Sequence, residues 1–408
     1  MKIVYLNDDY PPRSSGGASR VVFLLAKKMK ELGHEVLVVT TVRERKNEGE
    51  QNENGVCMFR IYSDYNERWR GWMSLYNPET VSKIAAIFYK IKPDVVHAHN
   101  VHFHLSYESL RKAKKAGARV FLTAHDVMSF TYTKFTPRER DCGRINYHVS
   151  FLQNLAIAQK RFNPFRNFVV RRYLGYCDKI FTVSDALQEA LRQNGIKNTE
   201  TVYNGLDATP ASTPFLARGK NGGGGEKKII LLAGRVSHEK GAYILIGVLP
   251  EIQKAVSRAS LRFVGVSEHE RKKFADYAAQ FGVEDSLDMT GWIDEAGMDA
   301  AYRESHVVVN PSLIFDSFPT TNLEAALNKK PVVATCFGGS KEFVIDGKTG
   351  YIVNPYRAEE LTAKIIDVLK NPEKAKAFGE AAHERLKKEF SLEKQAKKLL
   401  EFYNRPVA

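Results

Sequence analysis

The 408-residue sequence has few cysteines and no long apolar run. Its four cysteines, Cys57, Cys142, Cys177 and Cys336, form no CxxC pair, which argues against a zinc ribbon and a disulfide scaffold and suits a reducing cytosol. No stretch approaches the ~20 apolar residues of a membrane-spanning helix. The first residues, "MKIVYL", lack the pattern of a signal segment. We therefore expect a cytoplasmic protein.

The composition, with 43% apolar and 26% charged residues, is that of an ordinary globular protein, and the chain is too long for one hydrophobic core. A formal charge of +14 favours an anionic partner, which could be nucleic acid, a membrane surface or a phosphorylated small molecule. Charge alone does not choose among these partners.

Short runs rich in Val and Ile, such as "KIVYLN", "HEVLVVTT" and "RVFLTAH", alternate with helical segments, and this pattern predicts an α/β fold with parallel sheets covered on both faces. The alternation stops at 207–228, a Pro, Gly and Ser-rich stretch that we interpret as a linker. We expect a first domain at 1–206 and a second at 229–385. A C-terminal helix at 386–408 is expected to pack back on the first domain. The predicted architecture is two doubly wound, Rossmann-like domains facing across a cleft, with ligands at the carboxyl ends of the strands.

Two loops of the first domain contain candidate binding residues. Gly16 and Gly17 precede a predicted helix, where their backbone N–H groups could approach an anion; a plain turn with Ser19 as the helix N-cap is the alternative. The loop is not GxGxxG, which counts against a nicotinamide dehydrogenase. His125 ends a predicted strand and could face a ligand, although a lone histidine is more often structural.

A histidine-rich stretch, "HAHNVHFH", precedes His125 and raises the question of a metal. His97 and His99 should share one face of a strand. No acid or cysteine completes a ligand set, so we expect no metal site.

Charged residues follow two strands of the second domain. Arg235 and Lys240 flank a predicted helix start, where cations are disfavoured unless an anion such as a diphosphate lies between them; two solvated charges are the alternative. Asp316 and Glu324 bracket the turn "SFPT", whose amides begin a helix and could bind phosphate. The acids could then accept from sugar hydroxyls, or Glu324 could close a capping box with Thr321.

These motifs together resemble those of a large family of retaining glycosyltransferases with the GT-B fold, which includes sucrose synthase-like and mannosyltransferase-like enzymes. The resemblance runs over nearly the whole chain, through "GGAS", "TAHD", "VSDAL", "VYNGLD", "GRVSHEKG" and "DSFPTTNLEAALNKKPVVATCFGGSKEFV". It implies transfer of a hexose from a nucleotide-diphosphate sugar to a hydroxyl acceptor, in the synthesis of cell-surface polysaccharide or glycolipid.

The resemblance also implies roles for individual residues. Gly16 and Gly17 would approach the donor phosphate, His125 the transferred sugar, and Arg235 and Lys240 the diphosphate. In the family's E-x7-E signature the second acid binds the donor ribose and the first binds the sugar.

Those two roles fall here on Glu324 and on Asp316, which is one methylene shorter than the usual Glu. The turn residues between the two acids complete the predicted donor site; they are Phe318, Pro319, Thr320 and Thr321. Because cations take the place of magnesium, we expect a front-face, retaining reaction that needs neither a divalent metal nor a cofactor.

The acceptor side is less defined. The segment 151–177 contains five basic residues, several Phe and no acid, which is typical of a membrane-surface segment at the inner face of the membrane. An amphipathic helix with a core-facing apolar side is the alternative. Two other functions stay open: a nucleotide-sugar epimerase or hydrolase of the same fold, and, remotely, a nucleic-acid-binding protein, for which no binding module is present.

Overall fold

The chain forms two compact units in a computed structural model that describes residues 1–11, 16–53, 55–137, 141–143, 145–207 and 227–405. The first unit contains 1–135, 147–204 and 392–408, and the second contains 136–146 and 205–391. This division differs from the expected boundaries in two places. Residues 136–146 belong to the second unit, and the last change of unit falls after Ser391. Most of the expected linker, 208–226, lies outside the described residues.

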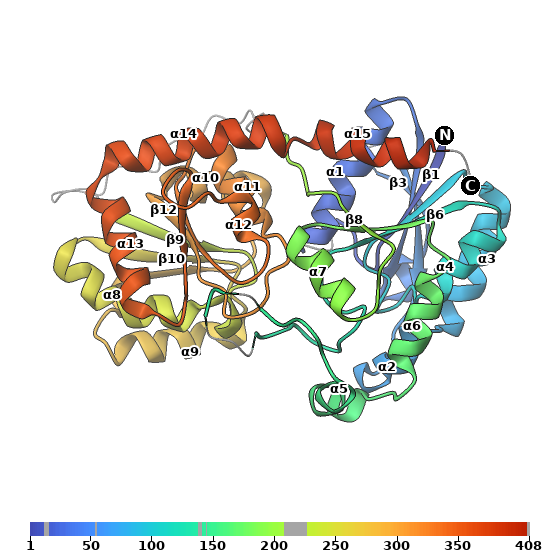
Figure 1. Cartoon of the computed structure of the whole chain (residues 1–408), viewed down its shortest axis with the longest axis horizontal. Coiled ribbons are helices and arrows are strands. Elements are labelled where there is room, and N and C mark those ends of the chain that lie inside the picture. Colours follow the sequence, from blue (N-terminus) through green and yellow to red (C-terminus); the bar gives the residue numbers. More distant parts are fainter. Residues whose placement is uncertain (12–15, 54, 138–140, 144, 208–226, 406–408) are drawn as a thin grey trace. The chain divides into compact units, whose positions relative to one another are not determined.

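In the first unit, parallel strands alternate with helices (Figure 1). Its strands are β1 (Lys2–Leu6), β2 (Glu35–Val42), β3 (Gly49–Glu53), β4 (Val56–Tyr62), β5 (Val95–Ala98), β6 (Arg119–Ala124), β7 (Lys179–Thr182) and β8 (Thr199–Thr201). Its helices are α1 (Gly17–Glu31), α2 (Arg70–Met73), α3 (Pro78–Ile91), α4 (Glu108–Lys115), α5 (Phe151–Ala158), α6 (Arg166–Leu174), α7 (Asp185–Gln193) and α15 (Leu392–Tyr403). Short 3-10 helices are η1 (Arg45–Asn47), η2 (Glu67–Trp69) and η3 (Gln159–Arg161).

The first sheet has, over the described residues, the strand order β3-β4-β2-β1-β5-β6-β7-β8. Only the β3–β4 pair is antiparallel among the described pairings, and β1 lies between β2 and β5, with Val4 opposite Leu37 and Val96. Helices α1 and α15 pack on one face around a shared core that includes Tyr5 and Phe402. The order reverses at β1, and in doubly wound folds ligands bind at the carboxyl edge near such a reversal.

The second unit repeats this design. Its strands are β9 (Lys228–Ala233), β10 (Ala259–Val264), β11 (Leu287–Thr290), β12 (Val307–Asn310), β13 (Val332–Thr335) and β14 (Gly350–Val353). Its helices are α8 (Ala242–Ala255), α9 (Glu268–Ala279), α10 (Glu295–Glu304), α11 (Thr320–Leu327), α12 (Ser340–Phe343), α13 (Ala358–Lys370) and α14 (Pro372–Glu389), with 3-10 helices η4 (His238–Lys240) and η5 (Glu284–Ser286).

All described pairings of the second sheet are parallel, in the order β11-β10-β9-β12-β13-β14. Read along the chain this is 3-2-1-4-5-6, the order of dinucleotide-binding folds, and it reverses between β9 and β12. Helices α8, α9 and α13 share one core with the sheet, and α11 and α14 pack against each other (Figure 1). The expected α/β architecture is confirmed in both units.

Three segments differ from the pattern expected from sequence. The β3–β4 hairpin was not predicted. The segment 151–177 is two helices, α5 and α6, joined by η3. The C-terminal helix expected at 386–408 is interrupted at Phe390 and Ser391, between α14 and α15. Within the described residues, no helix is both long and apolar enough to span a bilayer.

Candidate active site

The loop after β9 presents the two predicted cations of the second unit. Arg235 is exposed, and Lys240 ends the short helix η4 rather than occupying the first turn of α8. Gly241 follows with φ +82°, and a Cβ there would lie 2.3 Å from the carbonyl oxygen of Pro311. Only glycine fits this close approach, so the β9 loop is locked against the loop after β12.

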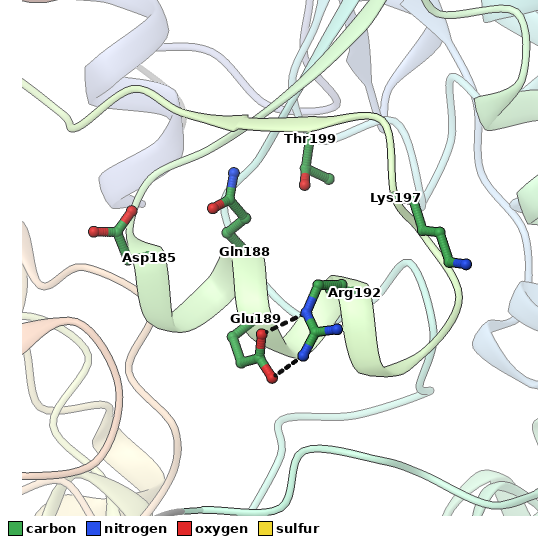
Figure 2. A pocket seen from close by; sticks show the side chains of 6 residues that line it. All are labelled: Asp185, Gln188, Glu189, Arg192, Lys197 and Thr199. Atoms are coloured by element: carbon green, nitrogen blue, oxygen red, sulfur yellow. Dashed lines mark hydrogen bonds and ion pairs between the residues drawn. The ribbon is translucent and has the colours of Figure 1, made fainter.

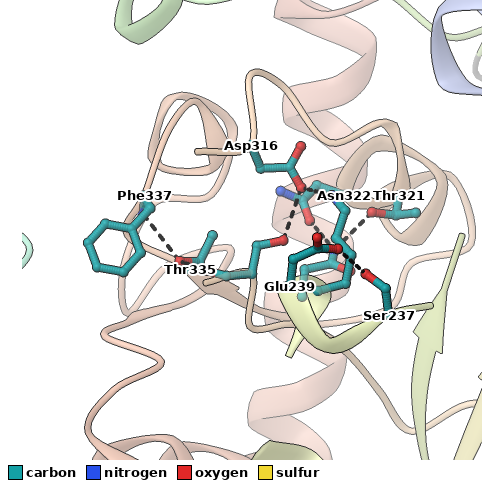
Figure 3. Close-up of polar contacts among 10 residues, drawn as sticks. Ser237, Glu239, Asp316, Thr321, Asn322, Thr335 and Phe337 are labelled. Carbon is teal, nitrogen blue, oxygen red and sulfur yellow. Dashed lines mark hydrogen bonds and ion pairs between the residues drawn. The ribbon is translucent and has the colours of Figure 1, made fainter. Parts of the chain in front are cut away.

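Asp316 lies opposite Lys240 and forms an ion pair with it, while Ser312 donates a hydrogen bond of 3.2 Å to the same carboxylate oxygen (Figure 3). The two partners come from the loops after β9 and β12, at the point where the strand order reverses. Lys240 is thus held next to an acid. A ligand that binds here meets a lysine whose position is already fixed.

The loop after β13 contacts the backbone of Asp316 and holds it in place. The backbone N–H of Gly339 donates to the carbonyl of Asp316 at 2.9 Å, and Gly338, at φ +93°, approaches so closely that a Cβ would lie 2.0 Å from that oxygen. Thr335 donates to the carbonyl of Ser312 at 2.8 Å, which ties the same two loops together (Figure 3). These contacts fix the backbone on which the acid is carried.

A disulfide joins Cys142 to Cys336, next to this loop, a pairing that was not predicted from the cysteine spacing. The two residues are 194 positions apart in the sequence, and no spacing motif marks such a pair. Asp141, beside Cys142, forms an ion pair of 3.3 Å with Arg357. These two contacts explain why residues 136–146 belong to the second unit.

Helix α11 begins at Thr320, with Pro319 as its N-cap and no side-chain cap. The capping-box interpretation is therefore wrong: Thr321 lies inside the helix, where its hydroxyl accepts from Asn310 at 3.0 Å (Figure 3). The ring of Phe318 is buried and stacks on Phe390, so what this residue offers a ligand is its backbone. A helix start without a side-chain cap leaves backbone amides that can bind an anion.

Glu324, on the second turn of α11, is buried, and its Oε2 accepts a hydrogen bond of 2.7 Å from the hydroxyl of Tyr302 on α10. A buried carboxylate requires such donors. Four residues of this site were not predicted from sequence: Tyr302, Ser312, Gly338 and Gly339. A Gly-Gly pair in the loop after a strand was the available signal for the last two, whereas nothing in the sequence connects Tyr302 to Glu324.

The predicted site residue of the first unit, His125, follows β6 and lies beside the histidines after β5. Its Nε2 is 2.8 Å from Nδ1 of His99, and the rings of His97 and His99 stack at 4.4 Å, which confirms that these two share a face. Burial lowers the pKa of His125 to about 4 and that of His97 to about 3. The cluster is therefore neutral near pH 7.

Gly16 is the N-cap of α1 and Gly17 its first residue, so the alternative with Ser19 as N-cap is wrong. Ser19 is buried and accepts instead from Asn7 at 3.3 Å. The neighbouring Asp8 accepts from the N–H groups of residues 103–105 at 2.7–2.8 Å, and burial raises its pKa to about 7. Asp8 thus shapes the loop after β5, a role that the sequence did not reveal.

A polar groove of about 670 Å³ lies along α7 in the first unit, lined by Asp185, Gln188, Glu189, Arg192, Lys197 and Thr199 (Figure 2). Arg192 and Glu189 are paired there by two hydrogen bonds of 2.7 Å. None of the predicted site residues lines it. Over the described residues, no group of three or more His, Cys, Asp or Glu side chains converges in a way that would hold a metal ion.

Comparison with known proteins identifies the class. In Thermosynechococcus elongatus, sucrose-phosphate synthase has a similar structure (TM-score 0.76, 18% identity, 98% of each chain), and so has Anabaena HepE in complex with UDP and glucose (TM-score 0.70, 19% identity, 98% of this chain and 99% of that one). The fold is therefore that of a GT-B glycosyltransferase.

The family follows from the sequence. The model of Glycosyltransferase Family 4 matches residues 15–209, and that of Glycosyl transferases group 1 matches 216–385. Glycogen synthase of Mycobacterium tuberculosis is 25% identical over 96% of this chain and 91% of its own length, and a glycosyltransferase of Methanocaldococcus jannaschii is 24% identical over 90% and 89%. The chain belongs to the group 1 glycosyltransferases and is a glycosyltransferase enzyme.

Proposed function

We propose that this enzyme transfers a hexose from a nucleotide-diphosphate sugar to a hydroxyl acceptor, with retention of the anomeric configuration. One observation carries the proposal: Lys240, Asp316 and the start of α11 meet where the order of the second sheet reverses. Cations, amides and a carboxylate in one place match a ligand that is charged in the middle and hydroxylated at its ends.

In this proposal, different residues bind the diphosphate, the ribose and the hexose of the donor. Arg235, Lys240 and the amides of Thr320 and Thr321 bind the diphosphate, and Glu324 accepts from the ribose hydroxyls. Asp316 accepts from the hexose hydroxyls, and the hydrogen bond that Ser312 donates limits where its carboxylate can turn. Gly16 and Gly17 approach the donor phosphate through their amides.

The reaction we propose breaks the bond between C1 of the hexose and the diphosphate oxygen while the acceptor oxygen attacks from the same face. The bonding electron pair leaves with the diphosphate, whose negative charge Arg235 and Lys240 stabilise. The acceptor's proton passes to that departing oxygen. These cations supply the charge that a divalent metal would otherwise bring, so neither a metal nor a cofactor is required.

His125 contacts the transferred sugar in this proposal. Because burial lowers its pKa to about 4, it acts as a neutral hydrogen-bonding group and adds no charge to the developing oxocarbenium ion. His99 fixes the ring through their mutual contact of 2.8 Å. The acceptor is a carbohydrate or a lipid-linked glycan, and the setting is synthesis of cell-surface polysaccharide or glycolipid on the cytoplasmic side of the membrane.

The test is a panel of UDP, GDP and ADP and their hexose derivatives, with magnesium or with EDTA. We expect one nucleotide to raise the melting temperature of the wild type with and without metal, and Glu324→Gln to reduce this shift. Glu380→Gln, at an exposed glutamate of α14, is the matched control and should keep it.

Product analysis decides the reaction class. With a suitable acceptor, early NMR spectra of the product should show the same anomeric configuration as the donor. An inverted product would contradict the mechanism. Free sugar released at the full rate without acceptor would instead identify a nucleotide-sugar hydrolase, and a changed sugar still attached to the nucleotide would identify an epimerase.

A further inference from the structure

Helix α5 of the first unit exposes apolar side chains and buries a polar one. It buries Asn154, whose side chain donates to the carbonyl of Phe130 at 3.2 Å, and exposes its apolar residues. Phe151 is 58% exposed and Leu152 73%, and Leu155 lies one turn further on the same side. A helix of a soluble protein normally does the reverse. The exposed side of α5 is therefore not explained by the core of its own unit.

Helix α6 continues this exposed apolar surface. Val170 and Leu174 face the core, whereas Phe165 and Phe168 are 65% and 66% exposed. At 100° per residue, Phe165, Phe168 and Arg172 lie within about 60° of one another around the axis. The outward face of α6 thus combines two aromatic rings with a cation.

The short helices η2 and α2 bring two tryptophans to the same region. Asn163, between α5 and α6, donates to the carbonyl of Gly71 at 3.0 Å, and η2 contacts η3. Trp69 and Trp72, on either side of Gly71, are each about half exposed. Figure 1 shows α2, α5 and α6 together within the first unit. We define the apolar patch as Trp69, Trp72, Phe151, Leu152, Phe165 and Phe168.

Cations surround the apolar patch. Lys160, Arg171 and Arg172 are exposed, and no acid occurs in 151–177. Arg166 is not among them, contrary to its place in the basic segment expected from sequence: it is buried and donates to the carbonyl of Met128. On the α2 side, the exposed Arg68 is accompanied by the exposed acids Asp64 and Glu67.

The cations around the apolar patch indicate what kind of partner binds there. A second copy of this chain docked through the same patch would bring like charges together, which costs free energy. An anionic lipid surface would accept the tryptophan and phenylalanine rings at the level of its headgroups and neutralise the cations. Exposed apolar patches of this kind mark interaction sites in soluble proteins.

We propose that the apolar patch of α2, α5 and α6 docks this enzyme on an anionic lipid surface. The rings insert at the interface, and Lys160, Arg171 and Arg172 contact lipid phosphates. This inference goes beyond the proposed function, because lipid binding of this kind requires neither donor nor acceptor.

The test is sedimentation of the full chain with phosphatidylcholine vesicles, with and without phosphatidylglycerol, at low and high salt. We expect binding to the anionic vesicles that weakens at high salt. The variant Leu152→Glu/Phe168→Glu should lose at least about tenfold in binding, because two apolar side chains no longer insert and two negative charges face the anionic lipid.

The matched control is Leu32→Glu/Tyr89→Glu, which adds the same charge at exposed apolar residues of the same unit outside the patch. It should bind vesicles like the wild type. Equal loss in both variants, or no vesicle binding by the wild type, would overturn the proposal. A wild-type dimer that the patch variant alone converts to monomer, without vesicle binding, would assign the patch to a second copy.

The nucleotide-induced thermal shift of both variants separates this inference from the proposed function. It reports on the second unit, where neither variant lies, and should be unchanged. Loss of vesicle binding with an intact shift therefore bears on the patch alone, whereas absence of any shift in the wild type bears on the donor site.

Discussion

The carboxyl edges of the two sheets carry opposite kinds of side chain. At the second sheet, Lys240 and Asp316 form an ion pair, and Arg235 is exposed beside them. At the first sheet, the buried His99 and the partly buried His125 contact one another, and desolvation lowers their pKa values. The same fold thus positions a lysine–carboxylate ion pair in one unit and a cluster of neutral imidazoles in the other.

From this difference we infer separate roles for the two edges in the proposed reaction. Fixed cations stabilise a diphosphate, both in the bound donor and as it leaves. A neutral, buried imidazole can hydrogen-bond a sugar without repelling positive charge that develops at its reacting carbon. Two duplicated Rossmann-like frames therefore acquire different chemistry through the residues that follow equivalent strands.

We expect the largest effect on the reaction from loss of Lys240, a cation of the charged edge. Lys240→Met should lower kcat by roughly 10²–10³-fold, because one charge on the leaving diphosphate is lost. Steady-state kinetics with saturating donor measures it. Lys272→Met, at an exposed lysine of α9, is the control. A rate within twofold of wild type would show that the cationic edge does not stabilise the leaving group.

A second difference is covalent, since the described disulfide belongs to the second unit. Cys142→Ser/Cys336→Ser should lower the free energy of unfolding by about 2–4 kcal/mol relative to the oxidised protein, because the long loop it closes is freed in the unfolded chain. Denaturant unfolding with and without reductant measures this.

The double variant and the reduced wild type should unfold alike. Intact-mass analysis under non-reducing conditions checks the bond itself. In a reducing cytosol the two thiols would stay reduced, and the reduced protein is then the working form. Free thiols at both positions in the protein purified under oxidising conditions would contradict the pairing.

The neutral edge should make the first unit sensitive to acid. Burial lowers the pKa of His97 and His104 to about 3 and of His102 to about 4, from 6.5. Because these folded-state pKa values lie below the unfolded value, the stability is complete above pH ~6.5 and is lost as pH falls toward the folded pKa values. Between pH 6.5 and pH 5 each histidine should contribute about 2 kcal/mol of this loss.

Asp8 acts in the opposite direction. Burial raises its pKa from 3.8 to about 7, so its contribution to the stability of the first unit falls as the pH rises from 3.8 to about 7. The histidines outnumber it, so acid should still destabilise the first unit. Hydrogen exchange at pH 7 and pH 5 measures it by segment. Equal change in the two units would contradict the contrast between the edges.

The smallest expected effect concerns the hydrogen bond that Tyr302 donates to Glu324, and it tests how Glu324 binds the donor. Tyr302→Phe removes the hydroxyl that donates to its Oε2 and should raise the donor KM about fivefold, corresponding to a net hydrogen-bond contribution of about 1 kcal/mol. The matched control is Tyr277→Phe, on α9. A 2′,3′-dideoxy donor should suffer no further loss in the Tyr302 variant, and an additional loss would show that Tyr302 does not act through the ribose contact.

Much of the fold could be predicted from sequence because strands buried on both faces are continuous runs of Val and Ile, and the loops after them were recognisable. The partners within the site could not. Lys240 and Asp316 are 76 positions apart, and Cys142 and Cys336 are 194 apart, so only the folded topology brings them together. The burial of Arg166 and the exposure of Leu152 depend on which side of each helix the sheet covers, and a periodic pattern does not say this.

The most direct test of the central claim is hydrogen exchange of the wild type with and without the preferred nucleoside diphosphate. We expect protection at 234–242, 312–324 and 335–340 of the second unit, with a smaller change at the histidine segments 97–104 and 119–127. Strongest protection at the histidine segments, or none at 312–324, would show that the charged edge of the second sheet is not where the nucleotide binds.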